Sequence, residues 1–129
     1  MSQAQSNGVL DLPFKAAADL SSYQYHFVYL SAANTVNVAG ANAKTIGILQ
    51  NKPDAANKTA VVRIIGTSKL IAGEAISRGK YITSKSDGHG EIADAAGEHV
   101  GAYAIEAATT AGDEIEVLVT NFDAYDSDA

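Results

Sequence analysis

The sequence predicts a small all-β domain, and three observations support that fold class. First, one turn phrase, alanine-glycine-acidic residue followed by an aliphatic residue two positions later, occurs at residues 72–76, 96–100 and 111–115. Glycine turns of this kind are typical of short strands. Second, several segments alternate apolar and polar residues with the period of a strand. Third, the chain has three Phe, six Tyr and no Trp, so its core must be built mainly from Val, Ile and Leu, which suits strands.

Length and charge restrict the function further. A chain of 129 residues fits one domain, and a domain of that size buries roughly two thirds of the surface exposed by its unfolded chain. The formal net charge is −6, and the basic residues are scattered singly between Lys15 and Lys85. Nucleic-acid binding needs clustered cations that replace phosphate counterions. We therefore expect no nucleic-acid partner.

Cysteine usage and the hydropathy pattern exclude other classes. The chain has no Cys, so it forms neither disulfides nor thiolate metal sites. Residues 1–7 have neither a basic start nor an apolar run, which predicts no signal peptide. No segment approaches the ~20 apolar residues of a membrane span. We expect a soluble protein that is synthesised in a cytoplasm and has no membrane partner.

The first 22 residues are predicted to form an N-terminal arm. Residues 1–8 are polar, and an abruptly apolar run follows, in which the candidate contact residues are Val9, Leu10, Leu12, Pro13 and Phe14. Pro13 argues against a central strand or a helix interior, because proline lacks a backbone N–H. We interpret the run as an extended arm that lies on another surface, and we expect a chain without residues 1–14 to remain folded.

A strand is predicted from Tyr23 to Leu30. Its alternation places four aromatic residues on one face, namely Tyr23, Tyr25, Phe27 and Tyr29. Packing within the sheet is one interpretation of this stripe. The other is a contact surface, because tyrosine combines apolar area with a polar tip and is enriched in interfaces. Tyr23, Tyr25 and Tyr29 are therefore further candidate contact residues.

The remaining strands follow in order. They are predicted at residues 36–38, 45–50, 59–65, 69–71, 79–84, 91–93, 99–107 and 114–120, with a break at residues 66–68 and a hairpin turn at residues 86–88. The β domain is thus expected to span residues 23–120. Residues 121–129 are interpreted as a solvated acidic tail; the alternative is an arm whose Phe122 and Tyr125 dock on a neighbour.

No group of residues predicts catalysis. Asp87, His89 and Glu91 alternate across a hairpin tip, where a polar turn is a better interpretation than a metal site. Glu114 and Glu116 share a strand face, as alternation with Ile and Val produces in any half-exposed strand. We expect no catalytic residue, no cofactor and no metal.

Several phrases in fixed order resemble one known family. They are Leu12-Pro13-Phe14, Ala18-Asp19-Leu20-Ser21, Gln24-Tyr25-His26-Phe27-Val28, Ile46-Gly47-Ile48-Leu49-Gln50-Asn51-Lys52-Pro53, Gly66-Thr67-Ser68-Lys69, Gly79-Lys80-Tyr81-Ile82-Thr83-Ser84 and Val100-Gly101-Ala102-Tyr103-Ala104. Over roughly residues 9–120 the order resembles the capsid decoration, or structural cement, proteins of tailed bacteriophages.

This resemblance implies both a fold and a function. The fold would be a compact β-barrel or β-tulip-like domain of short strands with an extended N-terminal arm. The protein would be a homotrimer on the outer capsid surface of the virion, where it would bridge neighbouring subunits of the major capsid protein against the pressure of packaged DNA. The family has no catalytic motif to carry over.

Two other function classes stay open. A virion-borne adhesin or carbohydrate-binding β-module would show an aromatic shelf on which sugars stack. A small hydrolase would show a cleft with perturbed carboxylates.

Overall fold

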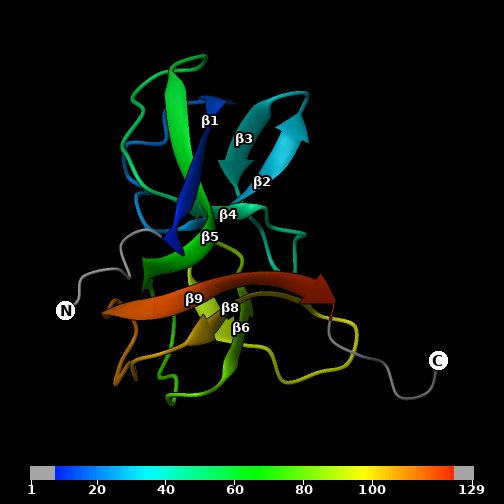
Figure 1. The fold of residues 1–129 in the computed structure, drawn as a ribbon, viewed down its shortest axis with the longest axis vertical. Coiled ribbons are helices and arrows are strands. Elements are labelled where there is room, and N and C mark those ends of the chain that lie inside the picture. Colours follow the sequence, from blue (N-terminus) through cyan, green and yellow to red (C-terminus); the bar gives the residue numbers. More distant parts are fainter. Residues whose placement is uncertain (1–7, 124–129) are drawn as a thin grey trace.

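The computed structural model describes residues 8–123, which form nine strands and no α-helix (Figure 1). The strands are β1 (Leu10–Ala16), β2 (Phe27–Ala32), β3 (Thr35–Val38), β4 (Gly47–Leu49), β5 (Thr59–Ile71), β6 (Tyr81–Ser84), β7 (Gly90–Ile92), β8 (His99–Ala104) and β9 (Glu114–Asp123). The predicted all-β class is confirmed.

Five of these strands close into a barrel. Their order is β1-β3-β2-β4-β5, and β5 returns to pair with β1. The closing pair is antiparallel and joins Leu12 to Val62 and Phe14 to Ala60, whereas β1 meets β3 in parallel only at Lys15 and Ala16. The barrel implied by the family resemblance is therefore present.

Strand β1 occupies most of the segment that we interpreted as an arm. It is extended, as expected, but it is a barrel strand, and Pro13 lies opposite Val61 of β5. Pro13 is tolerated because the pairing with β3 begins only at Lys15, so at Pro13 the strand has a described neighbour on one side only. This placement removes the basis for expecting residues 1–14 to be dispensable for folding.

Strand β5 connects the barrel to a second sheet. Up to Ile65 it pairs with β1 and β4, and from Gly66 to Ile71 it pairs with β9. The break predicted at residues 66–68 is instead the point where a continuous strand changes partners. Gly66 has a positive φ of 105°, and a Cβ there would lie 2.7 Å from the Gly8 carbonyl oxygen. Glycine is thus required at this point by both conformation and space.

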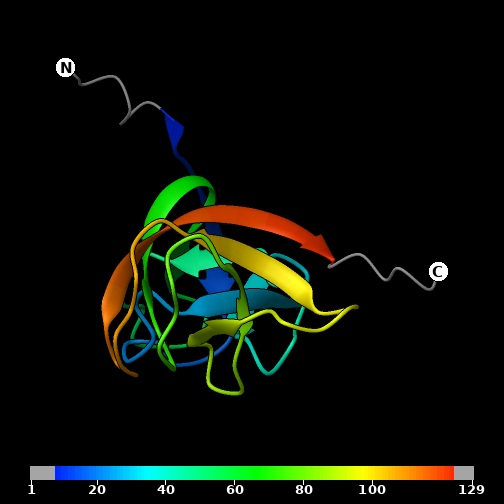
Figure 2. The same ribbon diagram turned by 90° about the horizontal axis from the view of Figure 1, so that it is seen from below.

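The second sheet has the order β5-β9-β8-β6-β7, and it lies below the barrel in Figure 1. The predicted hairpin is confirmed as the β6–β7 pair. Strand β9 runs on to Asp123, so the first three residues of the expected acidic tail are strand, and Asp123 pairs with His99. Tyr125 and the rest of the tail lie outside the described residues. Figure 2 shows the same sheet from below.

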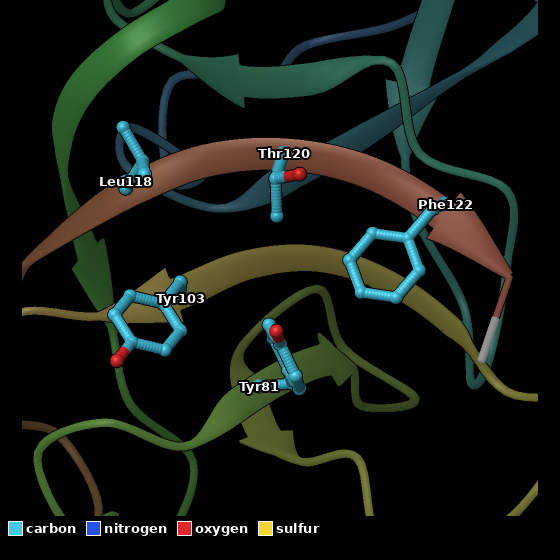
Figure 3. A pocket seen from close by; sticks show the side chains of 5 residues that line it. All are labelled: Tyr81, Tyr103, Leu118, Thr120 and Phe122. Atoms are coloured by element: carbon cyan, nitrogen blue, oxygen red, sulfur yellow. The ribbon is translucent and has the colours of Figure 1, made fainter. Parts of the chain in front are cut away.

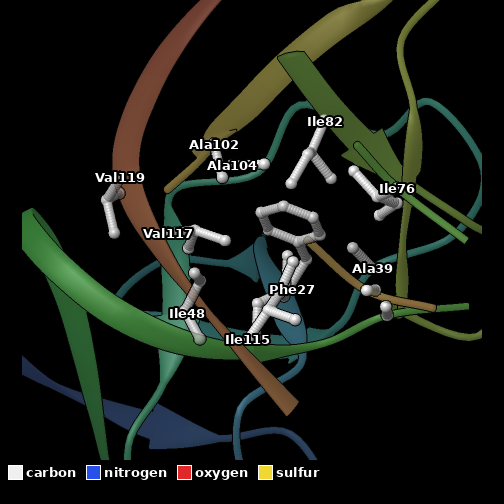
Figure 4. Close-up of a cluster of buried hydrophobic side chains, with 13 residues drawn as sticks. Phe27, Ala39, Ile48, Ile76, Ile82, Ala102, Ala104, Ile115, Val117 and Val119 are labelled. Carbon is white, nitrogen blue, oxygen red and sulfur yellow. The ribbon is translucent and has the colours of Figure 1, made fainter. Parts of the chain in front are cut away.

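Two clusters of buried side chains fill the domain, and neighbouring residues of β2 divide between them. Phe27 belongs to the cluster between the barrel and the second sheet (Figure 4), and Val28 belongs to the cluster inside the barrel. A Cβ on Gly101 would lie only 2.6 Å from the Phe27 ring, which is therefore tightly enclosed. We call these clusters the junction core and the barrel core.

The strand predicted from Tyr23 begins only at Phe27. Tyr25 has a positive φ of 65°, so the chain turns there and the predicted alternation does not hold. The turn is held by backbone hydrogen bonds, in which the Tyr25 amide donates to the Leu49 carbonyl and the Ile71 amide donates to the Tyr25 carbonyl. The four aromatic residues consequently do not share one strand face.

Candidate contact surfaces

An exposed apolar surface surrounds the start of β1. It consists of Val9, Leu10, Leu12 and Ile65, which are between 36% and 54% exposed, and we call it the N-terminal surface. Leu10 lies opposite Ile65 in the β1–β5 pairing. Exposed apolar side chains that form a contiguous patch on a folded domain are candidates for a site of interaction.

A charged pair holds this surface in place. Arg63 of β5 donates from Nε to Asp11 Oδ1 at 2.7 Å and from Nη2 to Asp11 Oδ2 at 2.9 Å. Its third nitrogen, Nη1, donates to the Thr67 carbonyl. The hydrogen bond from Arg63 lowers the pKa of Asp11. A two-pronged pair of this kind fixes orientation as well as distance, so β1 is tied to β5 between Leu10 and Leu12.

One edge of β1 is also open among the described residues. From Leu10 to Phe14 the strand pairs with β5, whereas its other edge meets β3 only from Lys15 onward. An unpaired edge presents backbone donors and acceptors to which another chain can add a strand. Leu12 and the exposed Pro13 lie along this edge, and Pro13 offers no N–H donor to it.

The other predicted contact residues lie elsewhere. Phe14 and Tyr23 are half-buried against the barrel core, and Tyr29 packs against the junction core. Tyr25 is half-buried, with the Lys69 ammonium 6.0 Å from the centre of its ring. Val9, Leu10 and Leu12 are each exposed near the start of β1, whereas the three tyrosines lie elsewhere.

The sequence analysis missed a second surface on the outer face of the second sheet. A hollow of about 340 Å³ is lined by Tyr81, Tyr103, Leu118, Thr120 and Phe122 (Figure 3), and we call it the aromatic hollow. The Tyr81 ring lies 5.5 Å from Tyr103 and 5.3 Å, edge to face, from Phe122. A partial signal was available in β9, where Leu118 and Thr120 alternate with Val117 and Val119 and therefore face the opposite side of the sheet.

A polar network links the barrel to the end of β9. The buried His99 ring contacts Asp123 Oδ1 at 3.0 Å and Asn121 Oδ1 at 3.1 Å. Thr45, in the loop before β4, donates to the same Asn121 oxygen, and Lys44 lies 3.6 Å from Asp123. The hydrogen bond with His99 lowers the pKa of Asp123. The network fixes the strand end that carries Phe122.

Groups that suggested chemistry in the sequence have structural roles. Asp87 contacts His89 at 2.9 Å within the hairpin turn, and Glu114 pairs with Lys69 at 3.4 Å. Burial raises the pKa of Glu91. Within residues 8–123 no group of three or more His, Cys, Asp or Glu side chains is arranged to hold a metal ion. The same residues contain no helix long and apolar enough to span a membrane.

Comparison with known proteins decides the family. The model of the phage cement protein family matches residues 4–120. The chain belongs to this family of phage cement proteins. No curated protein matches the chain. A solved structure with the same fold is the crystal structure of the head fiber gp8.5 N base in bacteriophage phi29. It is 19% identical, has a TM-score of 0.67, and the match covers 87% of this chain and 94% of that one.

The family match confirms the resemblance seen in the sequence. It makes the chain a decoration protein associated with the phage head, and it places the chain in a structural family of the virion. The likeness to the phi29 head fiber base shows a shared fold of barrel and appended sheet.

Proposed function

We propose that this cement protein binds the outer surface of the assembled head as a homotrimer and bridges neighbouring major capsid protein subunits without catalysing a reaction. The observation that carries the proposal is the family match over residues 4–120, to which the structure adds an exposed N-terminal surface. Val9, Leu10 and Leu12 are the residues that we assign to the capsid contact.

The geometry of β1 suits such a contact in two ways. Its leucines supply apolar area, at about 25 cal/mol for each Å² removed from water. Its open edge from Leu10 to Phe14 supplies backbone groups for an added strand of the partner, except at Pro13, which has no backbone N–H to donate. The Asp11–Arg63 pair prevents this edge from shifting relative to the barrel when the partner binds.

Bridging turns weak contacts into a stable shell. A protein that binds two subunits at once makes its second contact at a high effective concentration, so neither contact needs to be strong. A capsid that binds the folded form alone also stabilises the small domain by mass action. Repetition of the contact over a closed shell then opposes the outward pressure of packaged DNA.

The test is a sedimentation assay with heads that lack the protein. Wild type should sediment with the heads, and Leu10→Ser combined with Leu12→Ser should reduce the bound fraction at least tenfold, since two exposed apolar contacts are lost. Ile105→Ser is the matched control, because Ile105 is equally exposed but follows β8 in the second sheet. Equal binding by all three proteins would contradict the assignment of the N-terminal surface.

A further inference from the structure

The aromatic hollow is separate from the surface assigned to the capsid. It lies on the outer face of strands β6, β8 and β9, whereas the N-terminal surface lies at β1 and the barrel half of β5 (Figures 1 and 3). Four of its five lining residues are between 36% and 49% exposed, although they are large and apolar or aromatic. Nothing in the proposed capsid contact uses them.

The register of the strands builds the floor of this hollow. Leu118 of β9 lies opposite Tyr103 of β8, and Tyr103 lies opposite Tyr81 of β6, so the three side chains form one row across three strands. Phe122 lies further along β9 and meets the Tyr81 ring edge to face at an interplanar angle of 88°. Figure 3 shows the rings of Tyr103 and Phe122 on two sides of the hollow, with Tyr81 between them.

The lining has a definite chemistry. Three aromatic rings and a leucine supply apolar surface, while the hydroxyls of Tyr81, Tyr103 and Thr120 supply hydrogen-bond donors and acceptors. No lining residue is charged. A ligand that fits must therefore present an apolar face together with hydroxyl groups and no charge, which describes a pyranose ring of a neutral sugar.

The size of the hollow favours a small ligand over a protein. Five side chains line it, and its volume of about 340 Å³ lies at the lower end of the range of ~300–1,000 Å³ for ligand sites. A specific protein interface uses about 20–30 residues on each side. The next rung of the sheet is already charged, because Lys69 lies opposite Glu116 there. The apolar area therefore ends on that side of Leu118.

We propose that the aromatic hollow is a binding site for neutral saccharides, in which one or two pyranose rings stack on Tyr81 and its neighbours and hydrogen-bond to the tyrosine and threonine hydroxyls. The net charge of −6 disfavours acidic sugars. One site of this kind is weak, but a head that carries many copies presents an array of them, and the array binds a polysaccharide through effective concentration. The cement protein then also gives the head a carbohydrate-binding surface.

The test uses the full-length protein, ¹⁵N-labelled, and titrates it with maltose, cellobiose, lactose, mannobiose and chitobiose, with 3′-sialyllactose as the charged comparison. We expect at least one neutral disaccharide to shift the amide signals of residues 81, 103, 118, 120 and 122. If lactose binds, 3′-sialyllactose should bind more weakly, because its sialic acid adds a negative charge. If no neutral probe shifts these signals at its highest soluble concentration, the proposal is wrong.

Variants separate stacking from hydrogen bonding. Tyr81→Ala should weaken binding at least tenfold, which corresponds to about 1.4 kcal/mol, and Tyr81→Phe should retain most of it because the ring remains. Phe122→Ser is a second ring variant, and Leu30→Ala is the control, because Leu30 is exposed on β2 of the barrel. Sugar binding that Tyr81→Ala and Phe122→Ser leave unchanged would overturn the site.

Sedimentation of wild type and the ring variants in the absence of heads distinguishes a sugar ligand from a second protein copy in the hollow. The proposal expects the ring variants to keep the oligomeric state of wild type. If Tyr81→Ala or Phe122→Ser instead converts an oligomer into monomers, a second copy covers the hollow and the saccharide proposal is wrong.

Discussion

The barrel is a closed sheet, whereas the second sheet is open and is joined to the barrel through β5. In the second sheet, β6, β7, β8 and β9 pair antiparallel in sequence order or nearly so, and the long-range pair of β5 with β9 joins these strands to the barrel. The barrel closes only when β1 pairs with β5, across about 50 residues of chain. The strand that closes the barrel also carries the exposed N-terminal surface. In this molecule the proposed contact element is therefore part of the fold and not an appendage to it.

The largest effect is expected from removing β1. Deletion of residues 1–14 removes most of the β1–β5 pairing, the Asp11 carboxylate and the Phe14 packing, and it leaves Arg63 without its partner. We expect a loss comparable to the whole stability of such a domain, about 5–15 kcal/mol. Circular dichroism during urea unfolding measures it.

Deletion of residues 1–7 is the control, because every described strand remains. It should leave the unfolding midpoint unchanged. If the 1–14 deletion also unfolds like the full-length chain, β1 is a dispensable arm and the barrel does not depend on it.

A smaller but still large effect is expected at the junction core. Phe27→Ala should lower the free energy of unfolding by about 3–5 kcal/mol, because it removes a fully buried ring between the barrel and the sheet. Val28→Ala, one residue on, removes less volume and affects the barrel core. Urea unfolding of both variants, followed by one probe in the barrel and one in the second sheet, compares the two losses of stability. Separate transitions in wild type would show that the two halves unfold independently.

The charged pair of β1 and β5 should contribute about 1 kcal/mol. Arg63 and Asp11 form two hydrogen bonds and are partly shielded from solvent. The Lys58–Asp54 pair is well exposed and should contribute less than about 0.5 kcal/mol. Asp11→Asn is therefore expected to lower stability measurably, and Asp54→Asn is its matched control. Thermal unfolding at pH 7 measures the stability of both variants. If Asp11→Asn lowers stability no more than Asp54→Asn does, the Asp11–Arg63 pair has no special role.

The same pair predicts a dependence on pH. Because Arg63 lowers the pKa of Asp11 below its ordinary 3.8, the unfolded chain takes up the proton first as the pH falls. The contribution of Asp11 is complete above pH 3.8 and is lost as the pH falls through the folded pKa. The Asp11→Asn variant should therefore lose less stability than wild type as the pH falls below 3.8.

The smallest effect is expected from His26 at milder pH. Burial is the main cause that lowers its pKa below the ordinary 6.5, and the ring of His89 lies 4.5 Å away. The unfolded chain then binds the proton at higher pH than the folded one, so stability falls as the pH drops below 6.5. The slope of the unfolding free energy between pH 7 and 5 measures this. His26→Gln should reduce the slope; an unchanged slope would remove His26 as its source.

Local patterns predicted most strands, because alternation and glycine turns act over a few residues. The strands near residues 36–38, 81–84, 99–104 and 114–120 lie close to their predicted positions. Where prediction failed, a distant partner decided the structure. Pro13 is accepted in a strand because only one neighbour pairs with it there, and Gly66 bends a continuous strand because β9 takes over from β1.

The candidate site was predicted in part for the same reason. The run from Val9 to Leu12 is local, and its exposure could be anticipated from its place in a polar terminus. The alternation from Tyr23 to Tyr29 misled, because Tyr25 turns the chain before β2 begins. The aromatic hollow combines residues from β6, β8 and β9, which only the sheet register brings together.

The most direct test of the central claim compares the release of DNA from phage heads over a temperature ramp. Heads stripped of the protein, heads re-decorated with wild type, and heads treated with the Leu10→Ser, Leu12→Ser double variant are measured side by side. We predict that wild type raises the release temperature and that the double variant restores little of it. Identical release curves for stripped and re-decorated heads would contradict a cementing role.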